Sequence, residues 1–168
     1  MTTRHARITF SPDCSAVATV RNRILARADG WGVPLDADNR ESLRLVASEL
    51  ITNAVVHSSG HITVGLSYEP EEGRLLLVVH DGGASPPKRR DATADEDSGR
   101  GLALVDALAA RTGWEPTERG KSVWAEFEVT ALVCRTGAST PLRLRMPALT
   151  PRRGAKSARP PFAMAVAL

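Results

Sequence analysis

The chain has 168 residues, a length that suits one ordinary domain with a hydrophobic core and an additional tail. Cys14 and Cys134 have no metal-ligand spacing, and neither the first ten residues nor any later stretch has the long apolar run of a signal peptide or membrane helix. We therefore expect a cytoplasmic protein with no membrane partner. The net charge of +3 is uneven: fifteen basic and nineteen acidic residues before position 131 give −4, whereas residues 131–168 carry seven basic residues and no acidic ones.

The first sixty residues predict one strand and two helices. A short strand at 7–10 precedes a helix at 16–28, which ends at a Gly-Trp-Gly break. The second helix can be capped by Asp36 or Asp38 and runs to His57, with apolar residues recurring at three- and four-residue spacing. Its apolar stripe predicts a helix that packs one side against a core.

The rest of the body predicts strands and one further helix. Alternating and continuous apolar runs indicate an antiparallel hairpin from 61–69 and 74–81, then a helix at 102–110 and a final hairpin from 114–118 and 121–129. This order favours the α+β class, as a two-layer α/β sandwich with a mixed, mainly antiparallel sheet.

Two segments lack an apolar period. Residues 82–99 are rich in Gly, Pro, charged residues and Ser, and a loop of this length inside a compact domain is usually functional or disordered. Residues 131–168 form a basic segment rich in Pro, Ala and Arg. We expect them to be a largely disordered tail that follows a domain at 1–130.

The second helix carries three polar residues at four-residue spacing, Glu49, Asn53 and His57, which therefore share one face. Such a face is most often only solvated surface. It also has chemical potential: the amide oxygen of Asn53 suits Mg²⁺, which takes few protein ligands and completes its shell with water and phosphate. Glu49, one turn earlier, is placed to polarise a water or accept a hydroxyl proton.

A second candidate site is Asp81-Gly82-Gly83, which closes a buried strand. The carboxylate of Asp81 can accept a hydrogen bond from an exocyclic amine such as that of adenine, and Gly83 allows a flat ring to approach the backbone. The simpler interpretation is an Asp-Gly turn, and the dipeptide alone does not decide between them.

A third candidate is Gly99-Arg100-Gly101-Leu102, at the start of a predicted helix. The glycines permit close backbone approach, the helix N-terminus offers free N–H groups and partial positive charge to a phosphate, and Arg100 can add a charged donor. A flexible hinge that merely begins a helix explains the same residues about equally well.

A fourth candidate is Gly120-Lys121-Ser122, at the start of the last strand. The hydroxyl of Ser122 can reach a base or Asp81, directly or through a water, and Lys121 can meet a phosphate. A hairpin turn followed by an exposed lysine is the commoner reason for such a triplet, so this signal depends on the other three.

The order of these motifs resembles the GHKL ATPase superfamily over about Ser11 to Val129. The matching boxes are, in chain order, 49–54, 79–83 and 99–105. The resemblance implies a Bergerat fold with a left-handed βαβ unit that binds ATP and Mg²⁺. It implies Asn53 as the Mg²⁺ ligand, Asp81 as the adenine ligand, and the third box with the preceding loop as phosphate contacts.

Within that superfamily the chain is similar to the small anti-sigma-factor serine kinases, on the runs 53–57, 99–105 and 120–124. That group implies transfer of the γ-phosphoryl of ATP to a serine of an anti-sigma antagonist, with Glu49 as the base and His57 near the nucleotide. It also implies an antagonist, a sigma factor or both as protein partners, and it allows a homodimer.

One departure motivates an alternative. The superfamily usually has a further glycine two residues after Gly83, where this chain has Ser85 followed by two prolines. The alternative is a non-catalytic module in which ATP shapes a protein-binding surface. We do not expect nucleic acid as a partner, because the seven basic residues of 131–168 are scattered, with no interleaved aromatics and no helical period.

Overall fold

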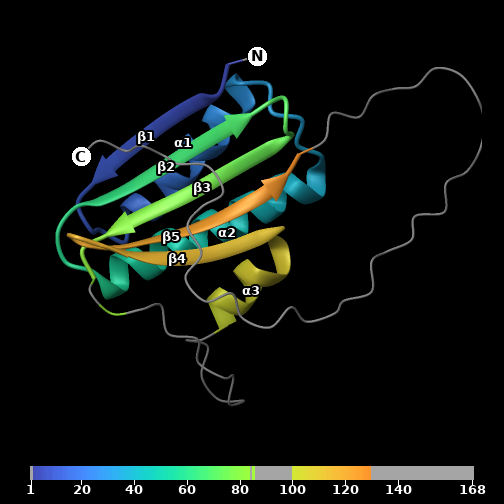
Figure 1. The fold of residues 1–168 in the computed structure, drawn as a ribbon. Coiled ribbons are helices and arrows are strands. Elements are labelled where there is room, and N and C mark those ends of the chain that lie inside the picture. The colour runs from blue at the N-terminus through green and yellow to red at the C-terminus, as the bar shows by residue number, and fades with distance from the viewer. Residues whose placement is uncertain (1, 84, 86–99, 130–168) are drawn as a thin grey trace, which may run out of the picture.

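The computed structural model describes residues 2–83, 85 and 100–129, and for Arg100 it describes the backbone only. The described part is a five-stranded sheet with three helices (Figure 1). Its elements, in chain order, are β1 (Arg4–Phe10), α1 (Ala16–Gly30), α2 (Ala37–His57), β2 (Ile62–Glu69), β3 (Arg74–Asp81), α3 (Arg100–Leu108), β4 (Arg111–Thr117) and β5 (Gly120–Glu128). The proposed boundary at residue 130 and the tail beyond it lie outside the described residues.

The strands lie in the order β1-β2-β3-β5-β4, and all four pairings between described strands are antiparallel. The α+β sandwich expected from the sequence is confirmed, but the expected mixed sheet is wrong in that detail. The last hairpin is inserted so that β5, not β4, pairs with β3. This register sets Asp81 directly opposite Lys121, and His80 opposite Ser122.

The core lies between the helices and one face of the sheet. Figure 1 shows α1 and α2 behind the sheet and α3 beside its β4 edge. The apolar stripe of α2 is almost fully withdrawn from solvent and meets inward side chains of β2, β3 and β5. The N-terminus of α2 is capped by Asp36, whose carboxylate accepts from the backbone N–H of Asn39 at 2.7 Å. The buried stripe and the cap together hold the polar face of α2 at a fixed place beside the sheet.

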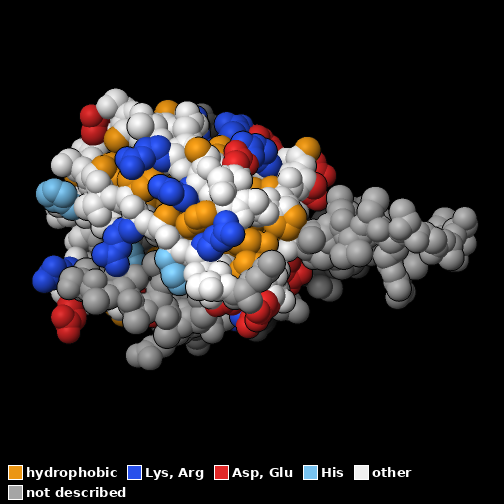
Figure 2. Space-filling view, turned by 90° about the horizontal axis from the view of Figure 1, so that it is seen from above, with side chains coloured by type: hydrophobic (Ala, Val, Ile, Leu, Met, Phe, Trp, Pro, Cys, Tyr) orange, Lys and Arg blue, Asp and Glu red, His pale blue; other side chains and the backbone are white. Residues whose placement is uncertain are grey.

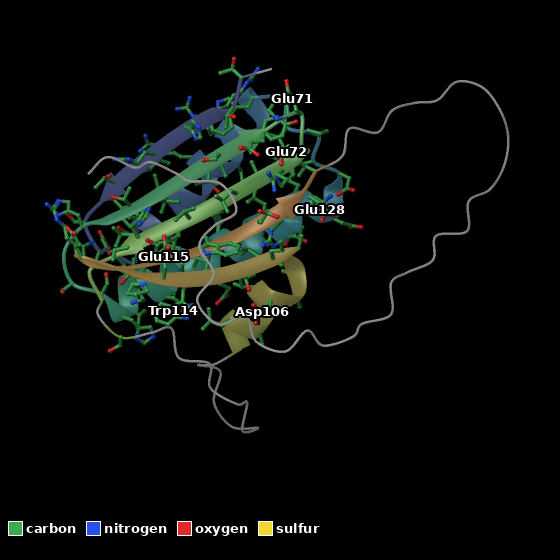
Figure 3. All side chains as sticks on the ribbon, viewed as in Figure 1. Glu71, Glu72, Asp106, Trp114, Glu115 and Glu128 are labelled. Carbon is green, nitrogen blue, oxygen red and sulfur yellow. The ribbon has the colours of Figure 1, made fainter. Side chains whose placement is uncertain are left out.

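A small tether joins α3 to the edge strand. Asp106, on α3, accepts a hydrogen bond from the hydroxyl of Thr112 on β4. Figure 3 shows Asp106 next to the strand that carries Trp114 and Glu115. Val105 of the same helix is buried in the main core. The C-terminal half of α3 is therefore held by both the core and the sheet edge.

Two strands extend further than the sequence predicts. β1 begins at Arg4 because residues 4 to 6 continue the antiparallel ladder with β2. β4 begins at Arg111 and includes Gly113, which looks like a break in the sequence. The ring of Trp124 on β5 fills the space where a side chain of Gly113 would stand, with Cε2 2.7 Å from the position of a Cβ. The glycine therefore accommodates a neighbouring ring within the strand.

The opposite face of the sheet carries a second, smaller apolar cluster, Leu76, Val78 and Trp124, over which none of the described helices lies. The molecule seen from above has basic side chains intermixed with hydrophobic ones (Figure 2). Among the described residues, no helix combines the length and apolar character needed to cross a bilayer.

Candidate functional site

The polar face of α2 is the axis of the candidate site. Glu49, Asn53 and His57 follow one another at single-turn intervals, and at 1.5 Å per residue the face spans about 12 Å. Glu49 and Asn53 are half-buried and His57 is exposed. One glycine motif contacts each end of this face, so two motifs far apart in sequence meet the same helix.

At the His57 end, Asp81 is held in a buried ion pair. Its Oδ1 accepts from the ammonium of Lys121 at 2.8 Å and from the backbone N–H of Gly83 at 2.8 Å. The side chains of Asp81 and Lys121 are only 2 % and 8 % exposed. A buried charge pair is tolerated only with good geometry and further hydrogen bonds, which Gly83 supplies.

The same end is packed at the level of the backbone. A Cβ on Gly83 would stand 2.9 Å from the carbonyl oxygen of His57 and 2.5 Å from Nζ of Lys121. Gly120 has φ +144° and its α-carbon faces the backbone carbonyl of Asp81 so closely that no side chain fits there. The end of α2, the residues that follow β3 and the start of β5 are therefore packed so closely that positions 83 and 120 have no room for a side chain.

At the other end, the carboxylate of Glu49 lies against the α-carbon of Gly101, in the first turn of α3. A Cβ on Gly101 would collide with Oε2 of Glu49. A carboxylate beside the N-terminus of a helix is favoured by the helix dipole. Leu102, the next residue, is partly buried against the core and fixes the direction of the helix start.

Two of the predicted phosphate contacts, Gly99 and the side chain of Arg100, lie outside the part of the chain that the structure describes. Gly99 is not among the described residues, and the side chain of Arg100 is likewise not described, although its backbone begins α3. The long loop from residue 86 to residue 99, including its Pro-Pro departure from the superfamily pattern, falls in the same gap.

The structure places Lys121 and Ser122 differently from the sequence expectation. Lys121 contacts Asp81, where the sequence suggested a phosphate. Ser122 lies on the opposite face of the sheet, where its Oγ is 2.7 Å from Nδ1 of His80. Strand alternation could have revealed this, because Val123 faces the core and Lys121, two residues before it, must share that face. Sequence reasoning therefore missed Lys121 as the partner of Asp81.

His80 is the other titratable side chain on these two strand ends. Burial holds the pKa of His80 below its ordinary value, the positive charge of Arg7 adds to that effect, and the negative charge of Asp81 opposes it. Its Nε2 is buried and has no hydrogen-bond partner among the described residues. Because His80 faces away from the helices, it is a neighbour of the candidate site rather than a member of it.

Asn53 could coordinate Mg²⁺ only together with ligands that do not come from the protein, namely phosphate oxygens and water. It lies midway between the two ends on the α2 face. The described residues contain no group of three or more His, Cys, Asp or Glu side chains that could hold a metal ion. One amide oxygen, with phosphate oxygens and water, is a normal magnesium shell in nucleotide sites.

The fold and the two-ended helix face define a class of protein: an α/β sandwich with a deep polar pair at one end of a helix and a glycine-initiated helix at the other. The family model of the histidine kinase-like ATPase domain matches residues 10–127. The chain therefore belongs to the histidine kinase-like ATPase family, and ATP is the nucleotide that this family membership implies.

Comparison with solved structures supports the fold. No curated protein matches the chain. Among solved structures, the RsbU and RsbW domains of Rv1364c from Mycobacterium tuberculosis match with a TM-score of 0.56 and 21% identity, over 75% of this chain and 32% of that one. At this identity the likeness is one of fold, and the chain spans about a third of the length of that protein.

Proposed function

We propose that this chain is an ATP-dependent regulatory protein of the anti-sigma-factor kinase type, which transfers the γ-phosphoryl of ATP to a serine of a partner protein. The observation that carries the proposal is the pair of contacts on α2: His57 with Gly83 at one end and Glu49 with Gly101 at the other. They support a site that runs along α2, with the proposed adenine ligand Asp81, on β3, beside the His57 end and the candidate base Glu49 about 12 Å away along the helix face.

The base of ATP is assigned to the Asp81 end. Asp81 is almost fully buried and accepts hydrogen bonds, which suits the exocyclic amine of adenine. Gly83 has no side chain, and its backbone N–H holds Oδ1 of Asp81 in place beside Nζ of Lys121, so the polar groups proposed to meet the base are gathered at one point. His57 contacts this end through its backbone carbonyl, and the residue is exposed.

The phosphates are assigned to the start of α3, where Gly101 and the N-terminus of the helix offer backbone N–H groups. Asn53 would hold Mg²⁺, and when bound the ion neutralises charge that develops on the phosphate oxygens. Arg100 and Gly99 stay proposed phosphate contacts on sequence grounds alone.

Glu49 is the proposed base of the transfer. The serine oxygen of the partner forms a bond with the γ-phosphorus while the bond to the β–γ bridging oxygen breaks, and ADP leaves with that electron pair. The serine proton goes to the Glu49 carboxylate. The contact with Gly101 orients this carboxylate toward the first turn of α3, which is where the phosphates are assigned.

The test compares Glu49→Gln with a matched control, Glu41→Gln, on the same helix. Glu41 is exposed and paired with Arg44. Titration calorimetry with ATP and Mg²⁺ measures binding, and ³²P transfer from γ-labelled ATP to purified anti-sigma antagonist domains measures catalysis. We expect Glu49→Gln to keep the affinity for ATP and lose transfer by about 10²- to 10⁴-fold, as for removal of a general base. Glu41→Gln should change neither.

The same experiment separates the alternatives. Unchanged transfer by Glu49→Gln would remove Glu49 from the base role. Wild-type protein that binds ATP and captures an antagonist domain or a sigma factor, without any transfer, would favour the non-catalytic, ATP-dependent binding module. Absence of ATP binding at millimolar concentration would overturn the nucleotide function as a whole.

A further inference from the structure

We propose that Lys121 is a specificity-determining residue for the base, and that its ammonium donates a hydrogen bond to N1 of adenine while Asp81 accepts from the neighbouring exocyclic amine. The inference rests on the proposed function, because it concerns the same nucleotide site. It assigns to Lys121 a direct contact with the ligand in addition to its ion pair with Asp81.

The position of the ammonium carries the argument. Nζ of Lys121 is 2.8 Å from Oδ1 of Asp81 and 3.4 Å from the carbonyl oxygen of Gly83. It also stands only 2.5 Å from where a Cβ of Gly83 would be. The ammonium therefore fills the space next to the α-carbon of Gly83, immediately beside the carboxylate that would receive the amine.

The donors of Lys121 are not exhausted by these contacts. A lysine ammonium has three N–H donors and no acceptor, and the described residues account for two of them, one on Asp81 and a longer one on Gly83. Within the described part of the chain, the third donor has no hydrogen-bond partner and is available to an incoming acceptor. A donor that is almost fully buried gains most from such a partner, since water cannot easily serve it.

The chemistry of the two side chains matches one edge of adenine. Adenine presents an amine donor beside a ring-nitrogen acceptor, and Asp81 offers only acceptors beside the donors of Lys121. A purine with an oxygen at position 6, bound in the same register, would set that oxygen against the Asp81 carboxylate, acceptor against acceptor. Asp81 and Lys121 would thus recognise adenine through two hydrogen bonds, one to its amine and one to its ring nitrogen.

A purely structural role for Lys121 is the rival explanation. The ion pair alone could justify a lysine here, since a lone buried carboxylate is costly. The two roles differ in one respect: a structural partner is indifferent to whether the ligand has an acceptor at N1. The test therefore changes that atom of the ligand.

Titration calorimetry on the full-length chain, with Mg²⁺ present, compares ATP with 1-deaza-ATP, in which N1 is replaced by a C–H group and the exocyclic amine is kept. A hydrogen bond from a charged donor predicts that 1-deaza-ATP binds the wild type about 10- to 100-fold more weakly than ATP. Lys121→Met should bind both nucleotides with equal, reduced affinity. Arg119→Met, an exposed cation in the same turn, is the control and should discriminate as the wild type does.

Equal binding of the two nucleotides by the wild type would overturn the inference without any variant. Discrimination that persists in Lys121→Met would overturn it too, because another donor would then contact N1. If Lys121→Met does not fold, Lys121→Gln replaces it, because glutamine keeps a neutral hydrogen-bond donor. This variant should still bind ATP more tightly than 1-deaza-ATP, but by a smaller factor than the wild type does. Failure of the wild type to bind either nucleotide would overturn the proposed function itself, a result distinct from equal binding.

Discussion

The two ends of the α2 polar face are built by different means. At the His57 end, three backbone segments meet through glycines, and the ion pair of Asp81 with Lys121 is sealed among them. At the Glu49 end, one half-buried carboxylate touches a single glycine of α3. The first construction fixes a position rigidly, as base recognition requires, whereas the second leaves a side chain that can adjust to the phosphates and the partner.

Substitutions in the ion pair of Asp81 with Lys121 should lower the stability of the protein more than substitutions at the Glu49 end. We expect Asp81→Asn or Lys121→Met alone to lower the free energy of unfolding by about 3 to 5 kcal/mol, because each leaves one buried charge without its partner. The double variant should cost much less than the sum of the two. Urea unfolding of the wild type and the three variants measures the coupling.

Additive costs would contradict that prediction and would mean that the two charges do not depend on each other. A matched pair at the exposed surface, Asp29 with Arg40, provides the comparison. Asp29→Asn and Arg40→Met should each change stability by no more than about 1 kcal/mol, since solvent screens an exposed pair.

Two glycine substitutions should distinguish the ends by a smaller amount. Gly83→Ala would press a methyl group on the carbonyl of His57 and on Lys121, and we expect a loss of about 1 to 3 kcal/mol in stability. Gly101→Ala would meet only the tip of Glu49, which can rotate away, and alanine is the better helix former. Its stability should change by less than about 1 kcal/mol.

The functional effect of Gly101→Ala should nevertheless be large relative to its stability effect. Displacing the Glu49 carboxylate should lower phosphoryl transfer while ATP affinity, measured by calorimetry, is retained. A transfer rate equal to the wild type, in a variant whose fold is intact by circular dichroism, would show that the Glu49–Gly101 contact has no part in catalysis.

The smallest expected effect concerns His80, which lies one residue before Asp81 on the outer face of the sheet. Its pKa is lowered in the folded protein, chiefly by burial. The folded state therefore binds this proton less readily than the unfolded chain, so stability should decrease as the pH falls below the unfolded pKa of about 6.5 and level off below the folded pKa.

Urea midpoints measured across this range should fall less with acidification in His80→Gln than in the wild type. His61→Gln, at an exposed position, should retain the wild-type pH dependence. An identical pH profile in His80→Gln and in the wild type would show that His80 titrates alike in both states, and that the strand ends are more open than the packing of the His57 end implies.

The sequence predicted the frame of the fold because its signals were local. The apolar stripe and the Asp36 cap define α2 to within a residue or two, and the alternation of β2 and the apolar run of β3 define the first hairpin. The start of β4 was not predicted, because the strand continues back through Gly113, a residue that strands usually lack and that here makes room for the ring of Trp124.

The sequence identified the residues of the candidate site, but it did not show which of them contact one another. Glu49 and Gly101 were both singled out, yet nothing local places one against the other across 52 residues of sequence. The partner of Asp81 depends on which strand pairs with β3 and in which register, and that is a tertiary property. Residues 86–99 and 130–168, which carry the remaining predictions, lie outside the described residues.

The register between β3 and β5 has a consequence for how this site can change over evolution. Because side chains alternate along a strand, deleting or inserting one residue near Gly120 would exchange Lys121 for Ser122 or Gly120 beside Asp81 and would turn Trp124 toward the helices. Single-residue insertions and deletions at this hairpin are therefore far less tolerable than point substitutions. A lineage that alters its nucleotide preference should do so by replacing the side chain at position 121 within a hairpin of constant length.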